Sequence, residues 1–373
     1  MYPVIFVHGF LGYGDGDGMN KVFPGFGALH GDTTRLFNSW GVPAYGPSLG
    51  GFSGLWDRCC ELYAYIKGGT VDYGKVHAAR NGHARFGATY PGVYPEWGTA
   101  AAPHTDTADS VASTGEVPIN KIHLVGHSFG GPTVDTFLQL LAFGSAEERE
   151  GTDPSDLSPL FSGNKGDWVF SATTMAPSFN GEDAAALAEA HPLVKPVMFG
   201  LLSAANLISG TIIAKVYDFH LARFGFTSRD RFLWYKPRDI LHYLRLKEDN
   251  ICYEESMDGF LELVKDYQLL PDVYYFMYRG YWCHDAGLTP FPNLPDAYPY
   301  NQPHKVLAVD DPAMNEYVCE TTSLADVKPG IWYTVPNSFA THTAYMGMGV
   351  DKSTYESFYR GIYERLKLLE GKS

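Results

Sequence analysis

A serine flanked by glycines stands where an expected strand meets an expected helix, in the pentapeptide Gly126-His127-Ser128-Phe129-Gly130. The apolar run 122–125 precedes it, and apolar residues recur at helical spacing after it until Gly144. Strand, sharp turn and helix in this order present a reactive serine at the carboxyl edge of a parallel sheet, where small residues let strand and helix approach closely. The pattern predicts an α/β fold in which Ser128 is the candidate nucleophile.

Other segments extend this α/β pattern along the chain. Short apolar runs at 4–7, 168–170, 273–276 and 331–333 indicate further buried strands. Near the end, Ser353-Thr354-Tyr355-Glu356 is a capping-box pattern that predicts the start of an amphipathic helix. The apolar stripe of that helix consists of Tyr355, Phe358, Tyr359, Ile362, Leu366 and Leu369. We therefore expect a mostly parallel, doubly wound sheet in a single domain that spans residues 1–373.

The charge balance argues against a nucleic-acid partner. The chain carries 42 acidic and 28 basic residues, a formal net charge of −14, and no run of Lys or Arg offers a track for phosphates. Its 40 Gly and 24 Pro indicate many tight turns and long loops. Composition is thus typical of a compact enzyme with extended surface loops.

Cysteines and apolar stretches set further expectations. The five cysteines are an odd number and form no CxxC pair, so a disulfide framework is not expected. The uncharged stretch 196–214 is interrupted by Gly and polar residues, which favours a buried or lid-forming helix pair over a transmembrane span. Because an apolar strand begins almost directly after Met1, no signal peptide is expected within this chain.

Acyl transfer at Ser128 would need two preset amide donors for an oxyanion, a base and an acid. Phe129 follows the serine, and Phe10 lies in the loop after the first strand, so their amides are the expected donors. The base should come last in the chain, and His342 lies between the 331–335 strand and the closing helix. His284 and His304 are its competitors, and His8 is interpreted as structural. The candidate acids are Asp310, Asp311, Glu316 and Glu320.

Several blocks of the chain resemble the thermostable zinc lipases of Gram-positive bacteria, a family of true triacylglycerol lipases on the α/β-hydrolase fold. The resemblance is carried by Pro3-Val4-Ile5-Phe6-Val7-His8-Gly9-Phe10, by Trp56-Asp57-Arg58, by 68–74 and above all by 77–87. The segments 158–161, 216–219 and 249–263 extend it over most of the chain. The resemblance implies a secreted hydrolase of acylglycerol esters that works at an oil-water interface.

A metal site is also implied by this resemblance. Two Asp and two His hold one zinc ion in the family, and the matching positions are Asp57, His77 and His83, with Asp239 as the fourth ligand and Asp230 as its alternative. A closed set of four ligands leaves no open position for water, so the zinc should be structural. Calcium at the family's site is not expected, because Ala344 stands where the family has an acidic ligand.

The remaining expectations concern the triad and its surroundings. Carried over from the family, the triad is Ser128, His342 and Glu316, where the family has Asp. Residues 57–100 should form the zinc-binding insertion, and residues 178–215 a lid region. A carboxylesterase or polyester hydrolase with the same triad is the alternative activity, and an inactive lipid-binding homologue is the alternative from another functional class.

Overall fold

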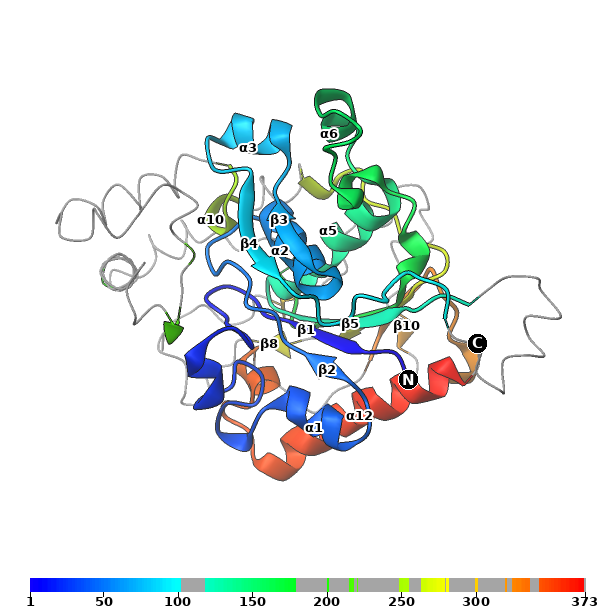
Figure 1. Ribbon diagram of the computed structural model, residues 1–373. Helices are drawn as coiled ribbons and strands as arrows, with labels where there is room; N and C mark the ends of the chain where they lie inside the picture. Colours follow the sequence, from blue (N-terminus) through cyan, green and yellow to red (C-terminus); the bar gives the residue numbers. More distant parts are fainter. Residues whose placement is uncertain are drawn as a thin grey trace.

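The computed structural model describes residues 1–101, 118–178, 200, 215–217, 220, 248–254, 263–278, 280–281, 299–300, 319–320, 324–335 and 342–371. In this part of the chain a seven-stranded sheet forms the centre of the molecule (Figure 1). Its strands lie in the order β10 (Cys319–Glu320), β11 (Trp332–Thr334), β7 (Tyr274–Tyr278), β6 (Val169–Met175), β5 (Ile122–His127), β1 (Val4–Val7) and β2 (Ala44–Tyr45). All neighbouring strands are parallel, which confirms the predicted α/β architecture.

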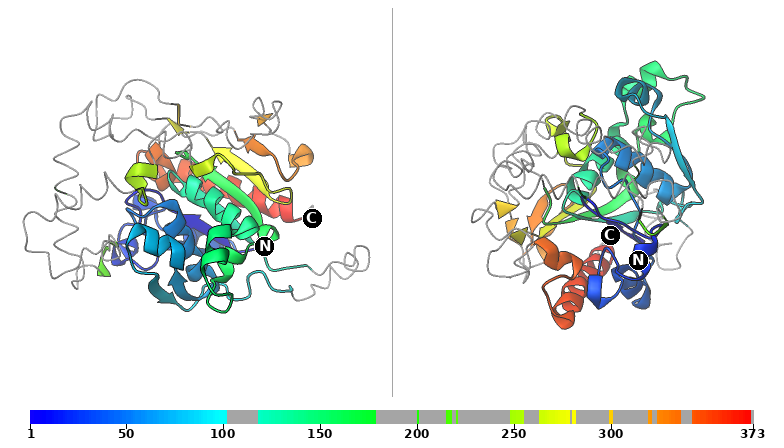
Figure 2. Two further views of the ribbon diagram at one scale, coloured as in Figure 1. Left: turned by 90° about the horizontal axis from the view of Figure 1, so that it is seen from above. Right: turned by 90° about the vertical axis from the view of Figure 1, so that its left-hand side faces the viewer.

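Helices cover both faces of the sheet. α2 (Leu55–Lys67) and α5 (Gly130–Phe143) pack on one face, whereas α1 (Thr33–Ser39) and α12 (Lys352–Glu370) lie on the other (Figures 1 and 2). The shorter helices are α3 (Lys75–Asn81), α6 (Ala146–Gly151) and α10 (Ile251–Glu254). The 3-10 helices are η1 (Gly18–Lys21), η2 (Ala28–His30), η3 (Pro159–Ser162), η4 (Gly166–Trp168), η11 (Leu324–Asp326) and η12 (His342–Met346). The doubly wound arrangement expected from the sequence is therefore present.

The packing of β1 explains why all of its residues are apolar, with no alternation of apolar and polar side chains. All four of its side chains are fully buried. Ile5 and Val7 belong to the core cluster shared with α2 and α5, whereas Val4 and Phe6 belong to the cluster shared with α12. A parallel strand covered by helices on both faces has no solvated side, so every position favours an apolar residue.

The closing helix forms as predicted, but it starts earlier than the capping-box pattern indicates. α12 begins at Lys352, and its N-cap is Asp351, whose carboxylate accepts hydrogen bonds from the Thr354 amide at 3.0 Å and from the Thr354 hydroxyl at 2.6 Å. Asp is as good an N-cap as Ser, and its charge also complements the helix dipole. The expected cap at Ser353 is therefore wrong by two residues.

Two small antiparallel sheets project from the central one. β3 (Gly69–Asp72) and β4 (Phe86–Tyr90) form a hairpin that encloses α3, within the predicted 57–100 insertion. β8 (Gly280–Tyr281) pairs with β9 (Pro299–Tyr300). The proposed lid region 178–215 lies almost entirely outside the described residues.

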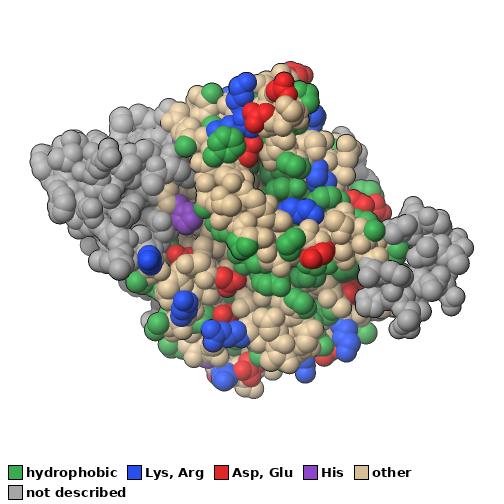
Figure 3. Space-filling model, viewed as in Figure 1, with side chains coloured by type: hydrophobic (Ala, Val, Ile, Leu, Met, Phe, Trp, Pro, Cys, Tyr) green, Lys and Arg blue, Asp and Glu red, His purple; other side chains and the backbone are tan. Residues whose placement is uncertain are grey.

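The described residues show how charged side chains are distributed over the surface. Acidic and basic side chains are interspersed over the described part of the face in Figure 3, with no continuous basic stripe. Among the described residues, no helix has both the length and the hydropathy that crossing a membrane requires. Cys59 and Cys60 in α2 are buried free thiols, and their burial raises the pKa of both well above 9.0.

Candidate active site and metal centre

Ser128 occupies a strained turn between β5 and α5. Its φ is +56°, in the left-handed region that side chains other than glycine rarely adopt. The turn is held by the Ser128 amide, which donates to the carbonyl of Met175 at 3.0 Å, and by the Gly131 amide, which donates to the carbonyl of Ser128 at 2.8 Å. Backbone strain that the surrounding hydrogen bonds maintain is typical of functional sites. The side chain is held at the carboxyl end of β5, where the sequence predicts the nucleophile.

The flanking glycines make this turn sterically possible. A Cβ on Gly130 would collide with the carbonyl oxygen of Val7, and a Cβ on Gly126 would collide with that of Gly130. A Cβ on Gly9 would lie 2.7 Å from the Cβ of Ser128. The loop after β1 and the turn after β5 thus touch each other, as they must if both are to contact one reacting group.

His342 lies beside the nucleophile turn, at the start of η12. It lines the same pocket as Ser128. Its backbone carbonyl accepts a hydrogen bond from Nε2 of His127 at 2.9 Å, and the two imidazole rings are 4.6 Å apart. Burial, with a smaller contribution from His127, lowers the pKa of His342 well below 6.5. The imidazole is therefore neutral near pH 7, as a general base must be before it accepts a proton.

His127 is a site residue that the sequence reading did not single out. It is buried, and desolvation lowers its pKa to about 4 against the opposing effect of its hydrogen bond to His342. A neutral ring has a single N–H, and here Nε2 carries it toward the carbonyl of His342. The second residue of the pentapeptide thus holds the segment that carries the candidate base.

The pocket has a volume of about 340 Å³. The residues that line it include Phe10, Leu11, Phe23, Ser128, His342 and Met346. Apart from Ser128 and the histidines, the lining is largely apolar. A concave, mainly apolar pocket with a few polar groups is typical of a site for a small organic ligand.

The two expected oxyanion donors flank this pocket. Phe129 lies one residue after Ser128 at the N-terminus of α5, and Phe10 lies in the turn that the Gly12 amide closes on the carbonyl of Gly9 at 3.1 Å. Neither the Phe10 amide nor the Phe129 amide has an acceptor among the described residues. Backbone N–H groups next to a nucleophile can stabilise the anion that forms on an attacked carbonyl.

His8 is fixed in a neutral form by its neighbours. Its Nδ1 donates to the carbonyl of Gly9 at 2.8 Å, because its Nε2 accepts the Leu49 amide at 3.0 Å. Burial first, and the Arg58 charge second, lower the pKa of His8 well below 6.5. The structure thus agrees with the interpretation of His8 as a structural residue of the loop. The competing bases His284 and His304 and the candidate acids Asp310, Asp311 and Glu316 lie outside the described residues.

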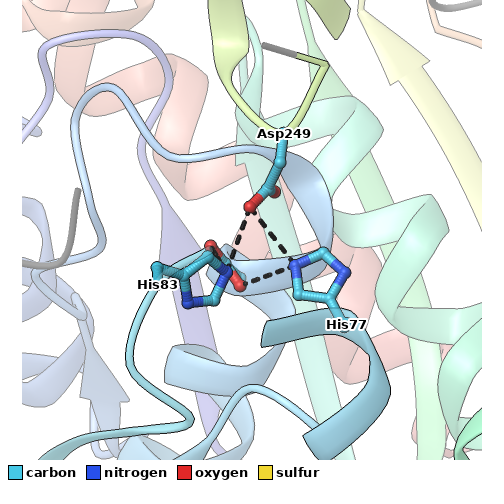
Figure 4. A group of neighbouring side chains, drawn as sticks. His77, His83 and Asp249 are labelled. Carbon is cyan, nitrogen blue, oxygen red and sulfur yellow. Dashed lines mark ion pairs between the residues drawn. The ribbon is translucent and has the colours of Figure 1, made fainter. Parts of the chain in front are cut away.

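A second cluster of reactive side chains lies at the N-terminus of α2. Asp57 in the first turn of α2, His77 in α3, His83 after α3 and Asp249 before α10 present ligand atoms that all lie within 4.8 Å of one another. Figure 4 shows His77, His83 and Asp249 pointing toward one another. The residues come from three separate segments, so the cluster ties α2, the 75–83 segment that contains α3, and the 248–254 segment together.

The spacing of these atoms suits a tetrahedral ion. Nε2 of His77 lies 3.3 Å from a carboxylate oxygen of Asp57 and 3.3 Å from one of Asp249. Nε2 of His83 lies 3.8 Å and 3.2 Å from oxygens of the same two residues. With metal-ligand bonds of 2.0–2.2 Å, the ligand atoms of a tetrahedral zinc site are roughly 3.3–3.5 Å apart. The four measured separations lie close to these values, so the cluster is consistent with a zinc site.

The surroundings orient the two histidines toward the cluster. Nδ1 of His83 donates to the carbonyl of Ala84 at 2.9 Å, so Nε2 is the nitrogen that faces the carboxylates. The His77 ring is stacked on Trp56 at 4.9 Å with an interplanar angle of 13°. Burial acts to lower the pKa of His77, but the carboxylates of Asp249 and Asp57 outweigh it and raise the pKa to about 9. Two buried carboxylates so close together require a positive partner.

Asp249 was not named among the ligands expected from the sequence. Asp239, the fourth ligand expected from the family resemblance, and Asp230, its alternative, lie outside the described residues. Within the described residues the cluster is completed by Asp249 instead. The sequence does contain a signal for this ligand, because Asp249 is the first residue of the 249–263 segment that resembles the family.

The chain is similar to known bacterial proteins in sequence and in fold. Residues 1–293 match the family described as "Lipase-like, C-terminal domain". Lipase 1 of Staphylococcus aureus (strain MRSA252) is 33% identical over 288 residues, which are 76% of this chain but only 39% of that protein. The chain thus spans well under half the length of the curated relatives it matches.

Two solved structures share the fold over nearly the whole chain. Lipase 1 from Pelosinus fermentans has a TM-score of 0.70 and 31% identity, with 97% of this chain and 98% of that chain covered. EstA from Clostridium botulinum has a TM-score of 0.71 and 29% identity, with 96% and 86% covered. The likeness extends over the segments that carry both the serine turn and the histidine-aspartate cluster.

Proposed function

Because the chain belongs to the bacterial lipase family described as lipase-like, C-terminal domain, we propose that it hydrolyses carboxylic ester bonds of acylglycerols with Ser128 as the nucleophile. One observation carries the proposal: Ser128 is held in a left-handed turn and shares an apolar pocket with His342 and with Phe10, whose amide is one of the two proposed donors. This arrangement supports a site in which Ser128 attacks an ester carbonyl, His342 accepts the serine proton, and the amides of Phe10 and Phe129 stabilise the oxyanion.

In the proposed reaction, His342 takes the proton of the Ser128 hydroxyl as its oxygen attacks the ester carbonyl. The negative charge that forms on the carbonyl oxygen is stabilised by the amides of Phe10 and Phe129. The same imidazole then gives its proton to the departing alcohol. A water molecule, deprotonated by His342, attacks the acyl-enzyme and releases the fatty acid.

The acid of the triad is proposed to be Glu316, with Asp311 as the alternative. Both lie outside the described residues, so this assignment rests on the resemblance of the 314–318 segment to the family's acid loop. Its role would be to hold His342 in the tautomer whose Nε2 faces the serine and to stabilise the imidazolium that forms.

The proposed substrates are lipid esters at an oil-water interface. Support comes from the apolar lining of the pocket and from the relatives named as lipases. We expect the purified protein to hydrolyse an emulsified long-chain triacylglycerol with a higher kcat/KM than a soluble short-chain ester. Titration of released fatty acid on both substrates checks this. A higher kcat/KM on the short-chain ester, with no gain in rate once that ester exceeds its solubility limit, would instead favour a carboxylesterase or polyester hydrolase.

A structural zinc ion is proposed at Asp57, His77, His83 and Asp249. The zinc would join α2 to the 75–83 segment that contains α3 and to the 248–254 segment, and would supply stability rather than a reacting group. Because four protein ligands would fill its coordination sphere, no step of ester hydrolysis passes through it.

We expect Asp249→Asn to bind zinc at least 100-fold more weakly, because even changes outside the ligand set cost roughly 10–100-fold in metal affinity. Metal analysis should find about one zinc per parent chain, and chelation should lower the Tm of the parent but not that of the variant. Asp239→Asn is the matched control. Zinc loss in Asp239→Asn with full retention in Asp249→Asn would return the fourth position to Asp239.

Two further features remain proposals that rest on the family resemblance. Residues 178–215 are proposed to form a lid over the pocket, and the protein is proposed to be secreted.

A further inference from the structure

Arg58 is a fully buried arginine in the first turn of α2, directly after the metal-cluster residue Asp57. Removing a guanidinium from water costs several kcal/mol unless its donors are satisfied, so completely buried arginines are rare. Arg58 donates to three groups: from Nε to the hydroxyl of Thr133 at 2.9 Å, from one terminal nitrogen to the carbonyl of Gly50 at 3.0 Å, and from the other to the carbonyl of His8. Each acceptor belongs to a different segment.

Two of these three acceptors lead to the oxyanion donors. The carbonyl of His8 stands two residues before Phe10, in the loop that carries the first donor. The hydroxyl of Thr133 accepts from Arg58 and donates to the carbonyl of Phe129 at 2.8 Å, so it fixes the residue that carries the second donor. The guanidinium also lies 5.5 Å from the centre of the Phe129 ring, within range of a cation–π contact.

The His8 side chain is held by hydrogen bonds to Gly9 and Leu49, whereas its backbone carbonyl accepts a hydrogen bond from Arg58. The carbonyl is thus the group through which Arg58 acts on this loop. Arg58 therefore spans the gap between the loop after β1 and the turn after β5, which come from strands that are neighbours in the sheet. A planar fork with donors at fixed angles can set this spacing, whereas a flexible ammonium cannot.

We propose that Arg58 is a positioning residue for ester hydrolysis: it fixes the distance between the Phe10 and Phe129 amides so that both reach one oxyanion. This inference rests on the proposed function. An oxyanion donor acts only within a few tenths of an ångström of its ideal place, and loss of one donor costs roughly 10²–10³ in kcat. Small displacements of either segment should therefore reduce turnover without weakening substrate binding.

The test compares two identical substitutions on one helix. Thr133→Val breaks the link from Arg58 to the Phe129 carbonyl, whereas Thr136→Val, one turn further along α5, removes only the hydroxyl that accepts the Tyr267 phenol at 2.9 Å. Both threonines are buried, and Thr133→Val loses two hydrogen bonds whereas Thr136→Val loses one, so the Tm should fall in both variants and further in Thr133→Val. Only Thr133→Val should also lose kcat, by about 10-fold, with KM close to that of the parent.

A second readout separates positioning from a loss of stability. An alkyl boronic acid forms a tetrahedral, negatively charged adduct with a catalytic serine, so its Kd reports the oxyanion donors directly. We expect the Kd to rise by the same factor as kcat falls, about 10-fold in Thr133→Val and about 100-fold in Arg58→Lys, and to stay unchanged in Thr136→Val. If Arg58→Lys does not fold, the two threonine variants decide the question alone.

Two outcomes would overturn the inference. If the two threonine variants have equal kcat and equal boronate Kd, Arg58 is a structural residue only. The same conclusion follows if Thr133→Val raises KM but leaves the boronate Kd unchanged. If the parent protein neither hydrolyses esters nor reacts with a fluorophosphonate at Ser128, the proposed function itself fails and this inference falls with it. An active parent with indistinguishable threonine variants refutes the role of Arg58 alone.

Discussion

Ser128→Ala is expected to abolish ester hydrolysis, with kcat reduced by roughly 10⁶-fold, because loss of the nucleophile costs about that much in other serine hydrolases. The substitution should leave the fold intact, since the side chain is partly exposed in its turn and Ala keeps the same Cβ. Initial rates on a short-chain chromogenic ester measure the loss of hydrolysis. Covalent labelling by a fluorophosphonate shows whether the reactive serine is lost. Thermal unfolding verifies that the variant is folded.

Ser39→Ala is a suitable control for this experiment. Ser39 is exposed at the end of α1, and its hydroxyl donates to the carbonyl of Leu36 at 2.7 Å, remote in role from the pocket. This variant should react with the fluorophosphonate and turn over substrate as the parent does. Turnover by Ser128→Ala within tenfold of the parent rate would remove the serine from the mechanism and with it the proposed chemistry.

Glu316→Gln should lose about 10⁴-fold in kcat with little change in KM, if Glu316 is the triad acid. An amide of the same shape keeps the geometry but favours the wrong imidazole tautomer, and that change has about this effect in a serine protease. The imidazolium formed during the reaction also loses its counter-charge. Steady-state kinetics on a soluble ester give both parameters.

Asp311→Asn makes the same chemical change at the competing acid. We expect it to lose less than tenfold in kcat, as an outer charge without direct contact to the imidazole would. The reverse ranking, with the large loss in Asp311→Asn, would assign the triad acid to Asp311. Both substitutions are conservative, so equal large losses accompanied by lower Tm values would count against either residue as the specific partner.

The fold could be predicted from the sequence where local pattern and tertiary environment agree. The runs at 4–7 and 122–125 are apolar because β1 and β5 are buried on both faces, and the helical spacing after Gly130 continues to Phe143 as α5 does. The strained turn at Ser128 could be predicted for the same reason, because such a turn leaves a glycine signature in the sequence. Each of these features is determined within about 20 residues of the chain.

Other features depend on contacts that no local pattern records. Asp249 precedes a helix of only four residues and joins Asp57 across about half of the chain, so no periodicity points to it. Arg58 and Glu61 lie in α2 at positions that a charge pattern would assign to solvent, yet both are buried. Their partners lie outside α2 and include both side chains and backbone groups, such as the Thr133 hydroxyl, which accepts from Arg58 at 2.9 Å, and the Gly50 amide, which donates to Glu61 at 2.7 Å. Only the assembled structure reveals these interactions.

β1 is synthesised before the two strands that it pairs with, and its pairing is completed late. It is paired with β2 on one side and with β5 on the other, and β5 begins only at Ile122. One edge of β1 therefore stays open until more than a hundred further residues have been added, and such non-local pairing slows folding. The Phe10 loop follows β1 and the Ser128 turn follows β5. Closing this strand pair thus completes the centre of the sheet and brings the Phe10 loop to the Ser128 turn at the same time, so recovery of activity after denaturation should not precede folding of the core.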